Sequence, residues 1–232
     1  MKLSIFPIAA SILVLSGCPN SNSDSHNEPV IKTYTITVSN LTNNQPLSPI
    51  TAIVHSNNYN LYTIGNPASV SLEKLAESGD NSEYLAIKDN NDNVYDAVSG
   101  SGIIAPGNSE SVSVTNPNEL AYLSIASMLV NTNDAFIAER SQKISTLAKG
   151  DSITLMLNVF DSGTEANSET ATTIPGPAGG GEGFNEQRND TNNQITVHAG
   201  VVTATDGLTT STLNATHRFT NPAAKLTITR SN

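Results

Sequence analysis

Cysteine and tryptophan are almost absent from this sequence: its 232 residues contain one cysteine and no tryptophan. The single cysteine, Cys18, has no partner within the chain, so stability must come from a packed core or from a bound metal. No other residue can supply a thiol nucleophile, and no Gly-x-Ser-x-Gly motif is present. The residues therefore give no support to a cysteine or serine hydrolase.

Positive charge is also scarce. The chain carries 11 Lys and Arg against 21 Asp and Glu, which gives a formal net charge of −10 at neutral pH. Nucleic acids and anionic lipid headgroups are bound through clusters of basic residues. We therefore predict no nucleic-acid partner, whereas divalent cations are compatible with so acidic a chain.

The first long hydrophobic run stands at the start of the chain. Lys2 precedes an apolar stretch at 5–15, which is too short to anchor a mature protein as a transmembrane helix. The stretch ends in Leu-Ser-Gly before Cys18, the pattern of a bacterial lipoprotein signal peptide, in which the cysteine thiol is diacylated and becomes the new N-terminus. The alternative is an ordinary secretory signal that contains a cysteine by chance. We predict lipidation of Cys18, because several acyl chains give stable membrane anchoring.

Three segments follow from this interpretation. Residues 1–18 form the signal peptide that ends at the lipidated cysteine, and residues 19–30 are a polar, turn-rich tether. Residues 31–232 have a length suited to one domain. Pro19 is not the aspartate that retains lipoproteins in the inner membrane. We expect localisation in the bacterial cell envelope, anchored in the outer membrane.

Alternation of apolar and polar residues dominates the remaining chain. Such segments predict strands, and the clusters of Asn, Gly, Pro and Asp between them predict turns. The alternating segments are 33–39, 111–114, 194–205 and 225–230. The pattern favours an all-β fold, an antiparallel β-sandwich.

Other segments depart from this alternation. Residues 71–79 place Leu72, Leu75 and Ala76 on one helical face, with Ser71 as N-cap and Gly79 as the stop. We expect this short helix to lie across one end of the sandwich. Residues 83–89 and 93–100 are interpreted as the two arms of a hairpin. Residues 162–194 have no periodicity and predict a long loop, which is either functional or disordered.

Two aspartates stand where apolar strands end. Asp134 follows the apolar stretch 120–130, and Asp161 follows 152–160, 27 residues along the chain from Asp134. If the strands are neighbours, both carboxylates reach the same end of the sandwich. Such carboxylates are solvated loop charge, an acid/base pair or ligands of a hard cation such as Ca²⁺. Their spacing alone favours solvated loop charge.

The segments 124–136 (SIASMLVNTNDAF) and 160–169 (FDSGTEANSE) together resemble the spondin domain. This family comprises the N-terminal adhesive module of F-spondin and mindin and occurs in many exported bacterial proteins. The earlier segment QPLSPITAIVHSNNYNLYTIGNPAS is similar to the bacterial pattern too. The resemblance spans about residues 33–230. It implies a C2-like antiparallel β-sandwich that binds one calcium ion at one end.

The resemblance also implies the calcium ligands. Asp134 and Asp161 match the two aspartates that bind the ion in the animal domains. The third ligand there is a glutamate, and a gap-free count places it at Thr115, which has no carboxylate, while Glu110 and Glu119 lie nearby. Glu165 or loop carbonyl groups are left to complete the site. Glu169 is interpreted as solvated charge.

These features lead to one functional expectation and two alternatives. The chain is expected to be an exported, lipid-anchored spondin-domain protein that binds Ca²⁺ and serves in adhesion or surface interaction. Its expected partners are the membrane, through the lipid on Cys18, and an unidentified protein or glycan. It is not expected to be an enzyme. The first alternative is a periplasmic hydrolase with paired carboxylates, and the second is a structural envelope lipoprotein without a ligand. Packing roles are expected for His55, His198 and His217.

Overall fold

A computed structural model describes residues 30–190 and 192–232. The predicted signal peptide, the lipidation site Cys18 and residues 19–29 of the predicted tether lie outside the described residues. No helix in the described part of the chain is both long enough and apolar enough to cross a membrane.

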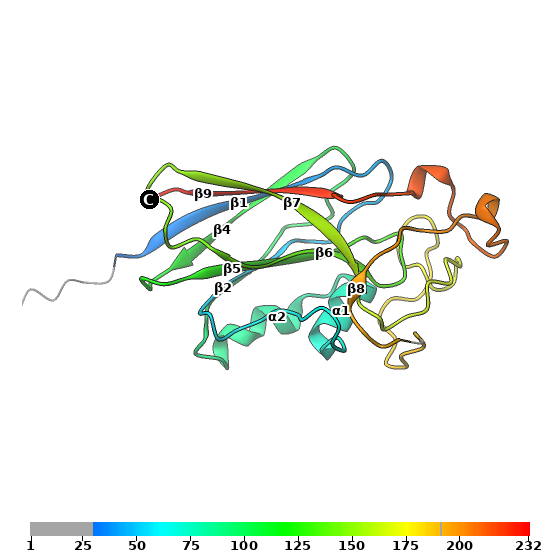
Figure 1. Cartoon of the computed structure of the whole chain (residues 1–232), viewed down its shortest axis with the longest axis horizontal. Coiled ribbons are helices and arrows are strands. Elements are labelled where there is room, and N and C mark those ends of the chain that lie inside the picture. Colours follow the sequence, from blue (N-terminus) through cyan, green and yellow to red (C-terminus); the bar gives the residue numbers. More distant parts are fainter. Residues whose placement is uncertain (1–29, 191) are drawn as a thin grey trace, which may run out of the picture.

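The described part of the chain is mostly β, with nine antiparallel strands and two short α-helices (Figure 1). The strands are β1 (Lys32–Asn40), β2 (Thr51–His55), β3 (Val94–Ser99), β4 (Ser109–Asn116), β5 (Tyr122–Met128), β6 (Ala135–Lys143), β7 (Ser152–Asp161), β8 (Thr196–Val197) and β9 (Ala224–Arg230). The helices are α1 (Val70–Ser78) and α2 (Ser82–Ala86), with 3-10 turns η1 (Ile87–Asp89), η2 (Ala204–Asp206) and η3 (Ala215–His217).

The strands form one continuous sheet that folds over into two layers. Its order is β3-β2-β5-β6-β7-β9-β1-β4, and β8 pairs with β7. Strand β7 joins the layers: residues 152–157 pair with β9, whereas residues 158–161 pair with β6. The outer strands β3 and β4 approach each other, since the backbone N–H of Thr115 donates to Asp96 Oδ2 at 2.7 Å. The sheet is therefore nearly closed, and the predicted all-β antiparallel architecture is confirmed.

The core between the layers follows from the alternation in the sequence. In β1 the alternate residues Tyr34, Ile36 and Val38 are fully buried, whereas the residues between them are only partly buried. Leu123 and Ile125 of β5 belong to the same apolar cluster from the opposite layer. Burial of such side chains is the main favourable contribution to folding.

Helix α1 forms where its periodicity predicts it, but it begins and packs differently. Ser69 is the N-cap, since its Oγ accepts from the backbone N–H of Leu72 at 3.2 Å, whereas Ser71 donates to Glu83 Oε2. Gly79 ends the helix in the left-handed conformation, as predicted. The helix covers the outer face of the β2–β5–β6 layer rather than an end of the sandwich (Figure 1), because its apolar face shares a cluster with Phe136 of β6.

Two strand predictions were wrong. Residues 83–89 form most of α2 and the 3-10 turn η1, because Tyr84 is buried in the cluster beneath α1 and a helical turn brings Leu85 and Ile87 against it. Residues 194–205 supply only the two-residue strand β8. That strand pairs with β7 only at Phe160 and Asp161, because β9 occupies this edge of β7 as far as Leu157.

The long loop gathers at one end of the molecule. Within the described part of residues 162–194 there is no helix or strand, as predicted. This loop lies beside the segment between β8 and β9 at the right-hand end of Figure 1. A small apolar cluster of Ile174, Val201 and Leu213 packs the two segments together. They cover the strand ends at which the predicted site lies.

Candidate metal centre

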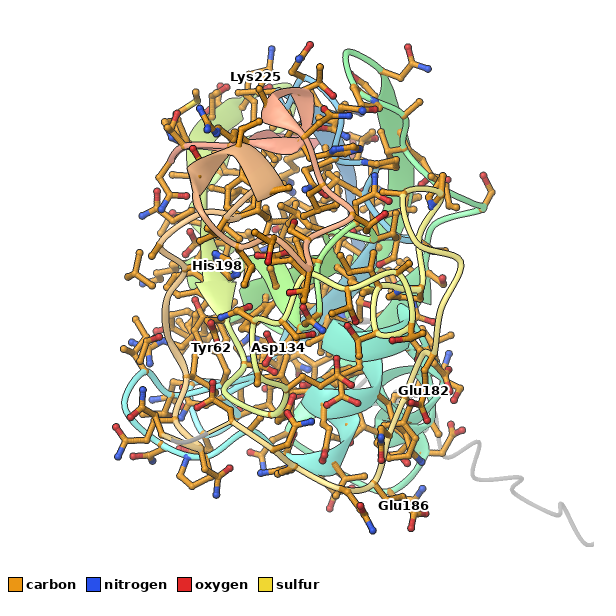
Figure 2. All side chains as sticks on the ribbon, turned by 90° about the vertical axis from the view of Figure 1, so that its right-hand side faces the viewer. Tyr62, Asp134, Glu182, Glu186, His198 and Lys225 are labelled. Carbon is orange, nitrogen blue, oxygen red and sulfur yellow. The ribbon has the colours of Figure 1, made fainter. Side chains whose placement is uncertain are left out.

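The two predicted aspartates meet at this loop-covered end. Asp134 immediately precedes β6 and Asp161 ends β7, and Ala135 pairs with Asp161 in the register of these strands. The backbone N–H of Ser162 donates to the carbonyl oxygen of Asp134 at 3.3 Å. In the end-on view Asp134 lies near the middle of the face (Figure 2). The prediction that both aspartates reach one end of the sandwich is confirmed.

Asp134 is fully buried, and only one of its carboxylate oxygens is satisfied. Oδ2 accepts from Ser162 Oγ at 2.8 Å and from the backbone N–H groups of Thr164 at 2.9 Å and Glu165 at 3.1 Å. Oδ1 accepts no hydrogen bond from the residues that the structure describes. A buried acceptor without a donor is costly, so this oxygen is a candidate ligand for a cation.

Asp161 holds the loop that follows it in a tight turn. Its Oδ1 accepts from the backbone N–H of Gly163 at 2.8 Å, and its Oδ2 accepts from Asn167 Nδ2 at 2.7 Å. Gly163 has φ +71°, and a Cβ there would come within 2.4 Å of the Gln194 carbonyl oxygen. Only glycine fits, because both the backbone conformation and the close approach exclude a side chain.

Electrostatic repulsion accumulates around these aspartates. Burial, together with the charge of Asp161, raises the pKa of Asp134 to about 7 from its ordinary 3.8. Burial raises the pKa of Glu165 to about 8, and the strongest charge repulsion on it comes from Glu77, followed by Asp134 and Glu182. The centre therefore holds more negative charge than its hydrogen bonds compensate.

Glu169 belongs to this centre, so its interpretation as solvated charge was wrong. It is 1% exposed, has φ +55°, and its backbone N–H donates to Asn133 Oδ1 at 3.1 Å. Burial raises the pKa of Glu169 to about 7, and the charge of Asp134 adds to this rise. The segment after β8 covers it: the backbone N–H of Thr212 donates to the Glu169 carbonyl oxygen at 2.8 Å. No local pattern in the sequence signals this burial.

The alternative positions for the third family ligand lie elsewhere. At the last residue of β4, Asn116 pairs with Lys32, the first residue of β1. This end of the molecule is opposite to the end at which β6 begins and β7 stops (Figure 1). Thr115 and Glu119 are therefore far from the centre. Glu110 accepts from Ser101 Oγ at 2.6 Å and so holds a different turn.

The predicted ligand Glu165 lies beside the centre, and its backbone contact with Asp134 fixes its position. Glu165 Oε2 accepts from Asn133 Nδ2 at 3.3 Å, and the residue is 4% exposed. Across residues 30–190 and 192–232, no three His, Cys, Asp or Glu side chains converge into a metal-binding group. A cation here would therefore be held by two carboxylates with neutral oxygens, a donor set that suits Ca²⁺, which takes six to eight oxygen ligands.

The three histidines in the described part of the chain are buried, and two of them pack against aromatic rings. His55 is fully buried, with its ring 5.0 Å from that of Tyr59 and Nε2 2.8 Å from Ser124 Oγ. His198 lies 5.3 Å from the ring of Phe219, and burial lowers its pKa although the charge of Asp161 opposes this. The lowered pKa means that the imidazole of His198 favours its neutral form, despite the opposing effect of the Asp161 charge.

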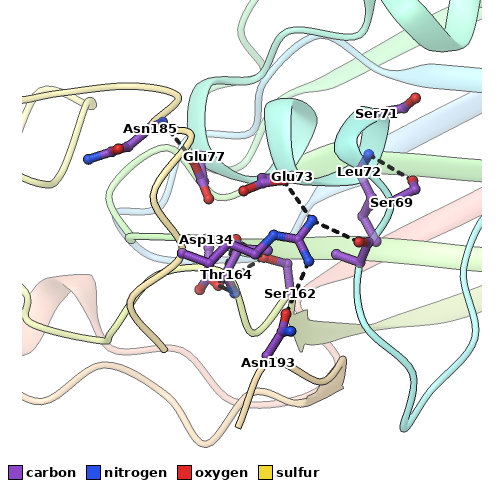
Figure 3. A network of polar contacts seen from close by, with 12 residues as sticks. Ser69, Ser71, Leu72, Glu73, Glu77, Asp134, Ser162, Thr164, Asn185 and Asn193 are labelled. Carbon is purple, nitrogen blue, oxygen red and sulfur yellow. Dashed lines mark hydrogen bonds and ion pairs between the residues drawn. The ribbon is translucent and has the colours of Figure 1, made fainter. Parts of the chain in front are cut away.

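A polar network joins helix α1 to the loop around the centre (Figure 3). Arg188 donates to Glu73 Oε2 at 2.6 Å, to the Ala68 carbonyl oxygen at 2.8 Å and to Asn193 Oδ1 at 3.0 Å. Glu77, one turn along α1 from Glu73, accepts from the backbone N–H of Asn185 at 2.9 Å. These contacts hold the later part of the long loop against the helix.

Comparison with known families agrees with this geometry. The Spondin_N family model matches residues 32–177, which is more than half of the chain and includes both strand ends. The chain belongs to the Spondin_N family. No curated protein matches it significantly. In this spondin domain the matched region ends within the long loop, but β9 lies between β7 and β1 in the sheet, so the folded unit continues beyond the match.

Proposed function

We propose that this protein is an exported, lipid-anchored spondin-domain module for adhesion or surface interaction, stabilised by Ca²⁺ at Asp134 and Asp161. Membership of the Spondin_N family supports an adhesion-type module. The observation that carries the calcium assignment is the buried, unsatisfied Oδ1 of Asp134 beside a second carboxylate. Neither aspartate forms an ion pair with a described Lys, Arg or His residue.

Calcium at this position would supply the missing positive charge and pin two strand ends together. Asp134 and Asp161 would each contribute carboxylate oxygen, with loop carbonyl groups and water as the neutral ligands. The carboxylate of the candidate ligand Glu165 does not converge with these two, so Glu165 would join the site only by turning its side chain toward the ion. The chain's own hydrogen bonds to Asp134 Oδ2 already fix that carboxylate in place, which leaves Oδ1 for the ion. A hard divalent ion with oxygen ligands matches this donor set.

Thermal melting with a calcium titration tests this proposal. The chain with Cys18→Ser, which prevents lipidation, is expected to gain melting temperature with added Ca²⁺ and to lose the gain in EDTA, since ligands that bind only the folded state stabilise it. Asp134→Asn and Asp161→Asn should abolish the gain, whereas Asp89→Asn on the exposed η1 turn should retain it. An undiminished response in both site variants would disprove the assignment.

The proposed lipid anchor is supported by the sequence around Cys18. The full chain, expressed in a bacterium with a lipoprotein pathway, should fractionate with outer membranes and incorporate labelled palmitate, while Cys18→Ser should be exported in soluble form. Recovery of both forms in the same membrane fraction without palmitate would contradict lipidation.

The paired-carboxylate hydrolase is disfavoured by burial. A glycoside hydrolase needs two carboxyl groups separated by about 5–10 Å that face a substrate groove. Asp134 is 0% exposed and Asp161 is 8% exposed, and loops cover both. We therefore propose a binding role instead of catalysis, and hydrolysis of envelope glycans that is abolished by Asp134→Asn would overturn this choice.

A further inference from the structure

Strand β7 has an open backbone edge where it parts from β6. Residues 158–161 of β7 pair with β6, but residues 152–157 pair only with β9, on the other side of β7. In Figure 1 the strand passes from the layer of β9 to the layer of β6. In the described chain, no backbone hydrogen bond joins residues 139–143 of β6 to residues 152–157 of β7. The two strands therefore enclose a notch that narrows toward Asn158, where their pairing begins.

The strand register identifies the backbone groups at this edge. Both backbone groups of a strand residue face the same neighbour, and successive residues face opposite neighbours. The Leu157 carbonyl oxygen accepts from the backbone N–H of Ala223 at 2.9 Å, so the odd-numbered residues of 151–157 face β9. Thr154 and Met156 therefore direct their N–H and C=O groups into the notch, where no described strand pairs with them. Such unpaired groups are a template for another strand.

The core-facing side chains beside the notch are incompletely covered. Ile153 and Leu155 pair with Ile228 and Leu226 of β9 and pack on the same apolar cluster. The two β9 residues are fully buried, whereas Ile153 and Leu155 are only partly buried. Covering apolar surface is favourable in water. A strand added at the notch would therefore be stabilised by apolar residues at its inward positions.

Positive charge borders the outer face of the notch. A cleft of about 220 Å³ is lined by Arg140 of β6, Met156 of β7 and Tyr62 from the segment after β2. The Arg140 guanidinium carbon lies 5.8 Å from the centroid of the Tyr62 ring, and Nη1 donates to the Tyr62 carbonyl oxygen at 3.5 Å. Lys143, further along β6, is exposed. Neither Arg140 nor Lys143 forms an ion pair with an Asp or Glu of the described chain.

The nearby carboxylates do not neutralise these two cations. Glu139 also lines the cleft but forms no ion pair with a described basic residue. Asp151, just before β7, uses Oδ2 to accept from the backbone N–H of Ala148 at 3.3 Å. In a chain with a formal net charge of −10, two unpaired cations at one open edge favour an anionic group on a partner.

We propose that the open edge of β7 binds an extended peptide segment of a partner protein, in which apolar and acidic residues alternate. The peptide backbone would pair with Thr154 and Met156 and add a strand to the sheet. Its apolar side chains would cover Ile153 and Leu155, and its Asp or Glu side chains would meet Arg140 on the outer face. This partner class rests on the surface-interaction role proposed above, but not on the calcium site or the lipid anchor.

The two other occupants of such an edge lack one half of this pattern. A second copy pairing through β7 would present Ser152, Thr154 and Met156 on the outer face, none of which is acidic. Residues 19–29 of the chain contain no Val, Ile, Leu, Met, Phe or Tyr to cover the inward side. A partner peptide can supply both kinds of side chain.

Amide hydrogen exchange tests whether the edge is open. In the free protein carrying Cys18→Ser, NMR should show faster exchange at Thr154 and Met156 than at Ile153 and Leu155, whose amides face β9. Slow exchange at Thr154 and Met156 in the free protein would overturn the proposal, because a second copy or another part of the chain would then already fill the edge.

Selection from a phage-displayed library of random dodecapeptides tests the partner class. Peptides selected on the same protein should alternate apolar with acidic residues and slow amide exchange at Thr154 and Met156. Arg140→Glu should weaken their binding about tenfold, because attraction becomes repulsion. Met156→Pro, which removes an edge N–H, should also weaken it. Lys88→Glu, the matched charge reversal on the exposed η1 turn, should leave binding unchanged.

Melting of each variant verifies folding, and Arg140→Glu keeps the test valid if the proline variant unfolds, since Arg140 is exposed. No selected peptide, peptides without the alternation, or equal binding to Arg140→Glu and the parent protein would overturn the proposal. If calcium-dependent melting is retained in that case, the proposed function still stands and its interaction surface lies elsewhere.

Discussion

Substitution of Asp134 by Asn should have opposite effects with and without calcium. The asparagine side chain keeps one carbonyl oxygen for the donors from Ser162, Thr164 and Glu165. Its amide group takes the place of Oδ1, which has no donor among the described residues. In EDTA at pH 8 we expect the variant to be more stable than the parent protein, because a buried negative charge next to Asp161 is removed.

The magnitude follows from the pKa of Asp134. Because the folded-state pKa of about 7 lies above the unfolded 3.8, the folded protein binds more protons in this window and the free energy of unfolding falls as the pH rises through it. This corresponds to roughly 4 kcal/mol lost by pH 8. If the asparagine substitution recovers half of this lost free energy of unfolding, about 2 kcal/mol, the melting temperature rises by about 4–8 °C for a domain of this size.

Differential scanning calorimetry in EDTA and in excess Ca²⁺ measures both effects on the melting temperature. The parent protein should gain stability with Ca²⁺, whereas Asp134→Asn should give the same melting temperature in both buffers. Asp89→Asn is the matched control, since it makes the same change on an exposed turn and should follow the parent protein. A variant that melts several degrees below the parent in EDTA at pH 8 would refute the reasoning, because the carboxylate would then be favourable without a cation.

Three further outcomes are expected. Gly163→Ala should lower the free energy of unfolding by about 1–3 kcal/mol or more in urea denaturation, because alanine would combine a left-handed φ with a clash against Gln194. An unchanged denaturation midpoint would contradict the turn described above. Arg188→Met should cost about 3 kcal/mol in the same assay by leaving Glu73 buried without its partner, and Arg188→Met with Glu73→Gln should recover part of this loss. In EDTA the melting temperature should fall as the pH rises from 5 to 8, because burial raises the pKa of Glu165 to about 8. Saturating Ca²⁺ should make the melting temperature less dependent on pH. A melting temperature that rises with pH in EDTA would contradict this prediction.

Local patterns were sufficient where the structure depends on local physics. Alternation predicted β1 because every second residue of 34–38 enters the core, and Gly79 predicted the end of α1 because the left-handed position there favours glycine. The same patterns failed for 83–89. The short apolar stretch 84–87 within this segment fits either a strand or a helix, and its packing beneath α1 selected the helix.

Three residues at the candidate centre were predicted from the sequence, namely Asp134, Asp161 and the neighbouring Glu165. Asp134 and Asp161 stand at strand ends, and the spondin resemblance related the two motifs across 27 residues. Glu77 and Glu169 were missed because their burial arises from segments far away in sequence: Asn185 reaches Glu77, and Val202 donates to Glu169 Oε1 at 3.4 Å. The pattern of charges in one segment does not reveal which segment, distant in sequence, will cover these side chains and exclude water from them.

The position of the centre explains why a cation there would matter for the fold. Strand β7 pairs with β9 through residues 152–157 and with β6 through residues 158–161, so its end at Asp161 is fixed by β6, through the pair of Asp161 with Ala135, and by β8. Asp134 stands at the start of β6, the strand from which β7 diverges. Repulsion between these two carboxylates acts at the end of the β6–β7 pairing, and an ion between them would turn that repulsion into an attraction that holds the two strands together. Calcium removal should therefore loosen the β6–β7 pairing first, with faster amide hydrogen exchange at Phe136 than in the β1–β9 pair, and uniform protection across both pairs would contradict this order.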